Sequence, residues 1–510
     1  MHQLFTVDKE KKFVYLLLFS VFIIATCGLI YELVAGTLAS YLLGDSVKQF
    51  SFIIGIYLFS MGVGSYFAKF IKRDLLNKFI EIEIIIALIG GTSSTLLFFL
   101  YNLTQHFEVI LYLLISITGC LVGIEIPILM NILKNKVNFR DLVSDVFTFD
   151  YIGALLASII FPLVLIPSLG IAKTSIFFGF INLSVAWMIL FMLKEHIIRP
   201  YFLKIKAFIV LIILILCFLY SNSIISYSEE QMFNEKIVIS KQSPYQKLVI
   251  TRNKNEYKLF LNNNLQFSTR DEYRYHEALI HPILSMSKKI DSVLVLGGGD
   301  GLAVRELLKY DEIKSITLVD LDKDMTDLFK NNTFLKKLND NSLSHPKVHI
   351  VNQDAFVWLK QTTLKFDVAI VDFPDPSNYS VGKLYTTTFY KNLKAALLPD
   401  AKIVVQTTSP YFAPKSFWCI HKTMKELFPS VEPFHVYLPS FGEWGFSLAS
   451  NGVHDSSTSI YRKVPSLKFY NYDFKSLTYF QKDMRVSSIE SNKLDNQVLV
   501  RYFDEEWGKL

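Results

Sequence analysis

The stretch Val293–Leu302, "VLVLGGGDGL", decides the fold of the second half of the chain. It has the pattern of a buried strand that runs directly into a glycine-rich turn, as in nucleotide-binding parallel sheets. Asp300 does not suit a pyrophosphate in that turn, because a carboxylate repels anionic oxygens. The stretch therefore predicts a nucleoside ligand that carries positive charge close to Asp300.

Strands and helices alternate around this stretch, with strand patterns such as "SITLVD", "KVHIVN" and "FDVAIVD" between helical ones. This alternation predicts an α/β, Rossmann-like domain of the methyltransferase type over residues 271–450. Ahead of it, residues 223–270 hold a polar linker and short alternating strands, which predict a small antiparallel β module. Residues 451–510 show little pattern and form a C-terminal tail of unclear structure.

Residues 1–222 differ in composition from the rest, and they hold most of the apolar residues of a chain that is 51% hydrophobic. A bilayer crossing needs about 20 apolar residues, and roughly seven stretches between Phe13 and Ser221 are long enough. We expect a polytopic α-helical membrane domain in the cell membrane, with the lipid bilayer as its partner.

Acidic side chains inside these apolar stretches need an explanation, because ionised groups are costly in a membrane. Glu32 and Glu125 lie well inside, where they could face a path for a cation or be neutral or paired within the bundle. Both interpretations stay open. Glu81 and Glu83 lie near the end of a stretch and are expected at the interface.

Charge and cysteine content exclude other classes of function. The net charge of +6 comes without a basic stripe, so nucleic acid is not an expected partner. The 4 cysteines have neither disulfide nor zinc-ligand spacing, and we expect no metal.

Acids follow each predicted parallel strand, at the edge where ligands bind in such sheets. They are Asp300, Asp320, Asp354, and the pair Asp372 and Asp375 in "VDFPDP". Alternatives are a solvated strand end for Asp320, a helix N-cap for Asp354 and a proline-rich turn for the pair. So many carboxylates in one place repel one another, which favours a polycationic ligand.

The ordered motifs "SPYQKLV", "DEYRYHEALIHP", "VLVLGGGDG", "LVDLD", "QDAF", "VDFPDP" and "LYTTTFY" resemble the spermidine synthases, or polyamine aminopropyltransferases. The resemblance covers about residues 243–450, and the apolar first half is similar to a membrane-fused subgroup. It implies transfer of an aminopropyl group from decarboxylated S-adenosylmethionine, as co-substrate, to putrescine or another polyamine. The products are spermidine and methylthioadenosine. No permanently bound cofactor is implied, and a homo-oligomer is possible.

The resemblance also assigns roles to residues. Asp372 would be the catalytic proton acceptor, and the substrate-binding residues would be His276, Asp300, Asp375 and Gln266. The nucleoside of the co-substrate would be held by Gln246, Gly297, Gly299, Asp320, Asp354 and Ala355. The sequence departs from many soluble members at "SNYSVGK" and at Phe441, which stands where they have a tyrosine. Both changes border the amine acceptor.

Two other functions remain as alternatives. One is a methyltransferase that uses intact S-adenosylmethionine, which Asp300 and "DFPDP" disfavour. The other is a polyamine transporter or sensor with a non-catalytic binding domain, which the presence of both Asp372 and Asp375 disfavours.

The side of the membrane is predicted differently by two arguments. Basic residues near Lys9–Lys12 and in alternate loops place the N-terminus in the cytoplasm, so an odd number of crossings would put the catalytic domain outside. The co-substrate is a cytosolic metabolite, which favours a cytoplasmic catalytic domain and implies a re-entrant span or a count that is off by one. We expect the cytoplasmic side.

Overall fold

The computed structural model describes residues 2–43, 46–101, 103–104, 106–134, 136–198, 200–452, 462–464 and 466–507. The chain divides into two compact units, Met1–Ile237 and Val238–Leu510. The sequence suggested a polar connector after residue 222, but helix α7 (Pro200–Phe233) continues through it. The segment contains no Gly or Pro to end a helix, so its polar residues continue the α-helix instead.

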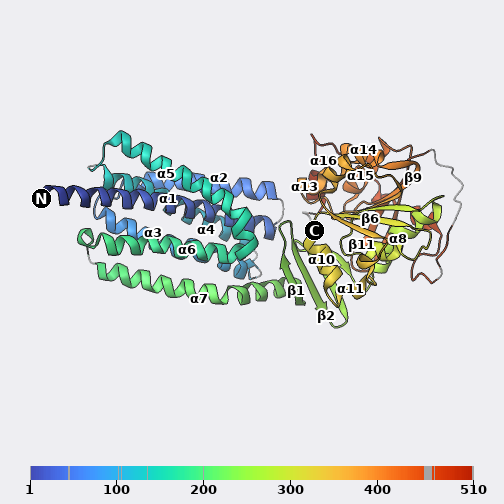
Figure 1. Ribbon diagram of the computed structural model, residues 1–510, viewed down its shortest axis with the longest axis horizontal. Coiled ribbons are helices and arrows are strands. Elements are labelled where there is room, and N and C mark those ends of the chain that lie inside the picture. The colour runs from blue at the N-terminus through green and yellow to red at the C-terminus, as the bar shows by residue number, and fades with distance from the viewer. Residues whose placement is uncertain are drawn as a thin grey trace. The chain divides into compact units, whose positions relative to one another are not determined.

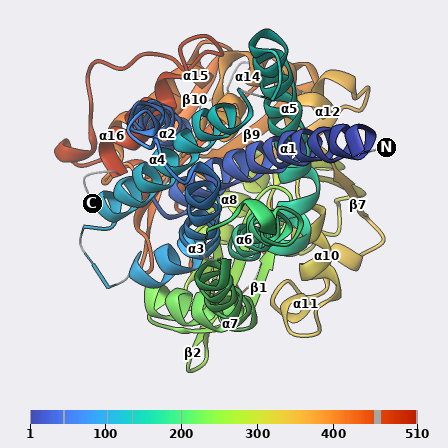
Figure 2. The same cartoon turned by 90° about the vertical axis from the view of Figure 1, so that its left-hand side faces the viewer.

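The first unit is a helical bundle (Figures 1 and 2). Besides α7, its α-helices are α1 (His2–Leu43), α2 (Ser46–Ala68), α3 (Leu75–Tyr101), α4 (Phe107–Leu133), α5 (Phe139–Ile160) and α6 (Ile166–Met192). Small residues let neighbours approach closely. A Cβ atom on Gly123 of α4 would lie 2.1 Å from the Met61 carbonyl oxygen of α2. Such contacts join α2 to α4, while α3 packs on α6 and α7, and α5 on α1 (Figure 2).

Among the described residues, six continuous helical stretches are long and apolar enough to cross a membrane. The longest, residues 139–192, comprises α5 and α6 and is broken at Gly170, whose φ of 72° and ψ of 177° are not helical. At about 1.5 Å per residue its length is about 80 Å, far more than the roughly 30 Å of one crossing. The stretch thus provides two helices of sufficient length. Counted in this way, the six stretches contain seven helices, and the sequence predicted roughly seven.

Of the two acids that were expected at the membrane interface, one is instead buried inside the bundle. Glu81 lies at the surface, where it pairs with Lys78 and Lys206. Glu83 was expected at the interface, but it is 0% exposed and faces Asn182 of α6. The two differ because residues two apart on a helix point to different faces, and α6 covers the face that carries Glu83.

The second unit begins with the predicted β module, a four-stranded sheet in the order β1-β2-β3-β4. Its strands are β1 (Lys236–Gln242), β2 (Lys247–Asn253), β3 (Glu256–Leu261) and β4 (Asn264–Ser268). Neighbours from β2 to β4 pair antiparallel, with a register shift between Leu259 and Phe260. Turns with asparagines at positive φ, Asn262 and Asn263, separate β3 from β4.

The main sheet has seven strands in the order β10-β11-β9-β8-β5-β6-β7. They are β5 (Ser292–Gly297), β6 (Ser315–Asp320), β7 (Val348–Asn352), β8 (Phe366–Asp372), β9 (Leu397–Gln406), β10 (Ser430–Leu438) and β11 (Gly442–Ser450). β5 to β9 pair parallel, and β10 and β11 add an antiparallel edge. β5 pairs with both β8 and β6, so the strand order reverses there and the carboxyl ends of these strands form the binding edge.

Helices accompany the strands of this sheet (Figure 1). They are α8 (Glu272–Met286), α9 (Leu302–Leu307), α10 (Lys323–Asn331), α11 (Leu335–Leu338), α12 (Ala355–Gln361), α13 (Tyr379–Gly382), α14 (Thr387–Ala395), α15 (Pro414–Lys425) and α16 (Val498–Trp507). Apolar side chains of β5 enter two core clusters on opposite faces, for example Val295 in one and Leu294 in the other. The sequence prediction of a Rossmann-like domain is confirmed.

The described part of the tail packs onto this domain. The buried carboxylate of Glu277 in α8 accepts the backbone N–H groups of Lys468, Phe469 and Tyr470 at 2.8 to 2.9 Å. At the other end, Glu506 of α16 accepts the N–H groups of Lys415 and Ser416 in the first turn of α15. The tail is held by these polar contacts and by buried apolar side chains such as Phe474 and Leu499, which join the core clusters of the domain.

Candidate active site

The glycine turn after β5 brings three strand ends together. Gly297 has a φ of 80°, and a Cβ atom there would lie 2.2 Å from the Asp372 carbonyl oxygen at the end of β8. A Cβ atom on Gly299 would lie 2.7 Å from Oδ2 of Asp320 at the end of β6, and the Gly299 N–H donates to that oxygen at 3.0 Å. Only glycine permits this backbone approach.

Asp320 and its surroundings form the nucleoside side of the site. Burial raises the pKa of Asp320 to about 7, although the N–H groups of Asp322 and Gly299 donate to its carboxylate. Asp322 in turn accepts from Nε2 of Gln246 at 2.9 Å and from Oγ of Ser243 at 2.7 Å. The β module therefore reaches the end of β6 through Gln246.

Asp300 lies in the turn before α9 and is 9% exposed. Its Oδ1 accepts the N–H of Leu302 at 2.9 Å, which fixes the side chain. Burial raises the pKa of Asp300, and the nearby His276 opposes that shift. A ligand cation at this position would offset the burial of the charge.

Asp372, the last residue of β8, has one side-chain hydrogen-bond partner among the residues that the structure describes. The Tyr275 hydroxyl of α8 donates to Oδ1 of Asp372 at 2.5 Å. Burial raises the pKa of Asp372 to about 6; His276 and the Tyr275 hydrogen bond lower it, and Asp300 raises it. The carboxylate is thus ionised at neutral pH but more basic than an exposed aspartate.

Asp375 follows in a turn whose backbone carbonyl groups accept hydrogen bonds from two buried side chains. The carbonyl oxygen of Phe373 accepts Nε2 of Gln406 at 2.6 Å, and that of Pro374 accepts the Tyr385 hydroxyl at 3.0 Å. Burial raises the pKa of Asp375 to about 7. Its Oδ1 is buried without a hydrogen-bond partner among the described residues, although hydrogen bonds from Gln406 and Thr408 to the carboxyl group lower its pKa.

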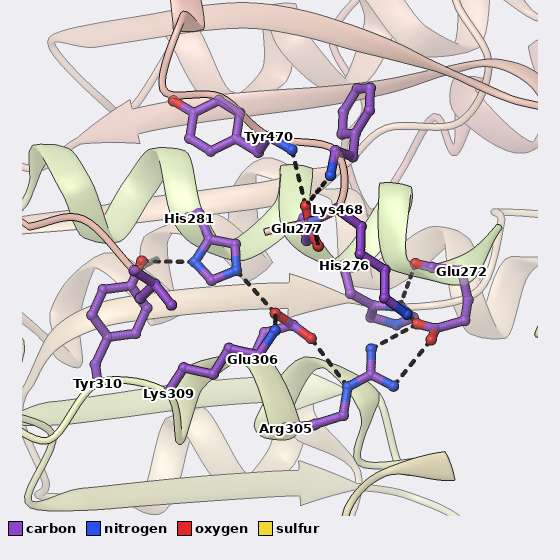
Figure 3. A network of polar contacts seen from close by, with 12 residues as sticks. Glu272, His276, Glu277, His281, Arg305, Glu306, Lys309, Tyr310, Lys468 and Tyr470 are labelled. Atoms are coloured by element: carbon purple, nitrogen blue, oxygen red, sulfur yellow. Dashed lines mark hydrogen bonds and ion pairs between the residues drawn. The ribbon is translucent and has the colours of Figure 1, made fainter. Parts of the chain in front are cut away.

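His276 belongs to a polar network with Glu272 and Arg305 (Figure 3). Its Nδ1 donates to Oε2 of Glu272 at 2.8 Å, and Nη1 and Nη2 of Arg305 grip the same carboxylate at 3.0 and 2.9 Å. Burial lowers the pKa of His276, but Glu272, Asp300 and Asp372 together raise it by more, so the net shift is upward. Because Nδ1 is engaged by Glu272, Nε2 is the nitrogen left for a ligand beside Asp300 and Asp372.

The remaining predicted residues are less closely tied to the acids. Asp354 caps α12 by accepting the Phe356 N–H at 2.8 Å and pairs with Lys383 at 2.6 Å, so its N-cap interpretation holds. Ala355 begins α12 and is buried. Gln266 on β4 donates its amide to carbonyl oxygens of its own strand. Contact of these three residues with a ligand stays a prediction.

Sequence reasoning missed the residues that hold the acids in place. They are Tyr275, Glu272, Arg305 and Asp322, and all but Arg305 lie within a quoted motif. A helical spacing of four between Glu272 and His276 was the available signal, since residues four apart share a helix face. No sequence pattern indicated that Tyr275 would meet Asp372 or that Arg305 would meet Glu272, because each pair joins two different elements. Among the described residues, no group of His, Cys, Asp or Glu is arranged to hold a metal ion.

Comparison with known proteins agrees with this geometry. Residues 272–460 match the spermine/spermidine synthase domain. A polyamine aminopropyltransferase of Leptospira interrogans is 50% identical over 96% of this chain and 98% of its own. Polyamine aminopropyltransferase 2 of Ralstonia nicotianae is 47% identical over 96% and 98%. Since both alignments include the helical unit as well as the sheet with its carboxylates, the chain belongs to the polyamine aminopropyltransferase family.

Proposed function

We propose that this polyamine aminopropyltransferase moves the aminopropyl group of decarboxylated S-adenosylmethionine to putrescine or a related amine. The observation that carries the proposal is the carboxylate of Asp372, held by Tyr275 beside His276 and Asp300 at the sheet's switch point. Asp320, with Gln246 reaching Asp322 next to it, would bind the ribose side of the nucleoside. Asp375 would bind the far ammonium of the acceptor.

In the reaction, the nitrogen lone pair of the acceptor attacks the CH₂ carbon bonded to the sulfonium. The new C–N bond forms as the C–S bond breaks, and the electron pair of that bond neutralises the sulfur to give methylthioadenosine. The attacking nitrogen must be neutral, so the acceptor ammonium first gives a proton to Asp372. Asp372 is a weak base for an alkylammonium even with a pKa of about 6, so passage of that proton to water completes the step.

Asp300 would select the donor by charge. Its buried carboxylate attracts the free ammonium of the aminopropyl arm, whereas intact S-adenosylmethionine would bring a second carboxylate to the same place. This selection separates aminopropyl transfer from methyl transfer. Alignment of the two reactants along one line would supply much of the rate.

We propose that the helical unit lies in the cell membrane and that the catalytic unit lies in the cytoplasm. Support for the first part comes from the length of the apolar helices and from large apolar side chains on the bundle surface, such as Phe59, Tyr151 and Leu163. Support for the second part is the cytosolic origin expected for the sulfonium co-substrate.

The test is an assay of purified full-length protein with decarboxylated S-adenosylmethionine and a panel of diamines and polyamines. We expect methylthioadenosine and an elongated amine in equal amounts, and no methylated product from intact S-adenosylmethionine. Asp372→Asn should lower kcat by about 10²- to 10⁴-fold, the usual range for loss of a general base. Full activity of this variant, or no product with any acceptor, would contradict the proposal.

A further inference from the structure

An ion pair joins helices α8 and α9 next to the candidate active site (Figure 3). Arg305 lies on α9, the helix that begins directly after the glycine turn and Asp300. Its Nη1 and Nη2 donate to Oε1 and Oε2 of Glu272 on α8, at 3.0 and 2.9 Å. The pair therefore connects the helix that follows Asp300 with the helix that carries His276.

Arg305 is itself fixed by further contacts. Its Nη1 also donates to the Leu338 carbonyl oxygen at 2.7 Å, and its Nε donates to Oε1 of Glu306 at 3.0 Å. The other oxygen of Glu306 accepts from Nε2 of His281 at 2.9 Å. Because these bonds use most of the five guanidinium N–H groups, the planar fork of Arg305 is held in one orientation.

The carboxylate that Arg305 holds also fixes the imidazole ring of His276. Nδ1 of His276 lies 2.8 Å from Oε2 of Glu272 and 2.8 Å from the Glu272 carbonyl oxygen. Burial raises the pKa of Glu272, but His276 and Arg305 lower it to about 2, so the carboxylate is an acceptor only. Nδ1 therefore carries a hydrogen, and in the neutral ring the lone pair lies on Nε2.

His276 lies close to the acids of the acceptor side. It follows Tyr275, whose hydroxyl donates to Asp372 at 2.5 Å, and the Tyr275 and His276 rings have centroids 5.0 Å apart. The His276 side chain is buried, and its charge interacts with Asp300 and Asp372. A lone pair on Nε2 thus offers an acceptor to an N–H group of an amine bound beside Asp372.

We propose that Arg305 is a positioning residue for the amine acceptor, and that it acts through Glu272 and His276. Its two-pronged grip holds the carboxylate that holds Nδ1, so the lone pair of Nε2 stays turned toward an N–H group of the bound polyamine. Arg305 acts without touching the ligand. The inference rests on the proposed function, because it takes the ligand beside Asp372 to be a linear polyamine.

Two titrations of purified full-length protein in detergent test the proposal, one with spermidine and one with methylthioadenosine. We expect Arg305→Gln to weaken spermidine binding about tenfold and to leave methylthioadenosine binding unchanged. His276→Ala should weaken spermidine binding at least as much. Arg305→Gln/His276→Ala should bind spermidine as His276→Ala does, because Arg305 has no effect once the ring is gone.

A second variant keeps the positive charge in case Arg305→Gln does not fold. A lysine ammonium cannot grip both carboxylate oxygens in one plane, so Arg305→Lys should weaken spermidine binding about threefold, and only when His276 is present. Lys309→Met is the matched control. It removes another cation of the same network, which contacts Glu306 and not Glu272, and should bind both ligands as the unmodified protein does.

Three results would overturn the proposal. They are unchanged spermidine binding in folded Arg305→Gln and Arg305→Lys, equal losses for spermidine and methylthioadenosine, and losses that add in the double variant. The last two would show that Arg305 only stabilises the fold. Failure of the unmodified protein to form methylthioadenosine would contradict the proposed function instead, since both titrations measure binding and not turnover.

Discussion

The hydroxyl of Tyr275 sets how basic Asp372 is, because its hydrogen bond stabilises the ionised carboxylate. Tyr275→Phe removes that bond, so the pKa of Asp372 should rise above its value of about 6. Asp372 must be ionised to accept a proton, and the acid limb of the pH profile of kcat/KM should therefore move to higher pH. We also expect kcat to fall about tenfold, equivalent to about 1.4 kcal/mol.

The control is Tyr273→Phe, which changes a half-buried tyrosine of the same helix; within the described part of the chain its hydroxyl makes no hydrogen bond to the acids. Its pH profile should match that of the unmodified protein. A Tyr275→Phe profile that keeps its acid limb, with only a lower maximum, would show that the hydroxyl does not act on Asp372.

Asp375 carries a stability cost in the free enzyme. Its folded pKa of about 7 lies above the unfolded value near 3.9, so its contribution to stability is greatest at low pH and is lost as pH rises through 7. Asp375→Asn should therefore raise Tm at pH 8, by an amount equivalent to on the order of 4 kcal/mol, and raise it about a third as much at pH 5, which lies only about one unit above the unfolded pKa. Thermal unfolding at the two pH values measures this, with the exposed Asp400→Asn as control; equal Tm values at pH 8 would contradict it.

The acids of the site could be predicted because each stands at the carboxyl end of a strand in a parallel sheet. Asp300, Asp320 and Asp372 were placed in this way. The groups that hold them could not, since Tyr275 and Asp372 are 97 residues apart and meet only after α8 packs on the sheet. For Asp354 the alternative prediction of a helix N-cap is correct, and the side chain caps α12.

At the scale of elements, α16 supports the short helix α13 that follows the "DFPDP" turn. A Cβ atom on Gly382 of α13 would lie 2.4 Å from Cγ2 of Val500 in α16. Gly382→Ala should therefore displace α13 and raise KM for the amine about tenfold, while KM for the sulfonium donor stays unchanged. Val500→Ala in the same chain should restore the amine KM, because it removes the overlapping methyl groups.

Steady-state kinetics with each substrate varied in turn would test this pair of elements. Val500→Ala alone serves as the control and should leave both KM values close to normal. If the double variant is no better than Gly382→Ala, α16 does not position α13 for acceptor binding.

Elements with a clear hydrophobic period could be predicted, such as β5, β6 and β8 and the long apolar helices. Two kinds of element could not. The end of α7 is polar but helical, since helix propensity and continuation from an existing turn outweigh polarity. The path of the tail depends on contacts with distant segments: Glu277 of α8 accepts N–H groups of the tail, and the tail's own Glu506 accepts the N–H of Lys415 in α15.

For the whole molecule, the number of helices that cross the bilayer determines whether the two ends of the chain lie on the same side. If all seven α-helices of the first unit cross the bilayer, the two ends of the chain lie on opposite sides. With the catalytic unit in the cytoplasm, the N-terminus would then lie outside, against the preference of Lys9–Lys12 for the inner side. Either that preference is overridden or one helix does not cross.

Reporter fusions decide the side of the catalytic unit. We expect a C-terminal green fluorescent protein to be fluorescent and a C-terminal alkaline phosphatase to be inactive in bacterial cells, as for a cytoplasmic end. The same two reporters on the N-terminus then give the parity of the crossings. An active C-terminal phosphatase would contradict the proposed location.

The contacts of α16 also bear on the order of events during synthesis. Glu506 accepts the N–H of Lys415 in α15, which lies 91 residues before it in the sequence, and Val500 contacts Gly382 of α13. A chain is synthesised from its N-terminus, so α16 is made after the whole helical unit and after the strands that carry the acids. The acceptor side of the catalytic site is therefore completed only once α16 has been synthesised and has folded back onto α13 and α15.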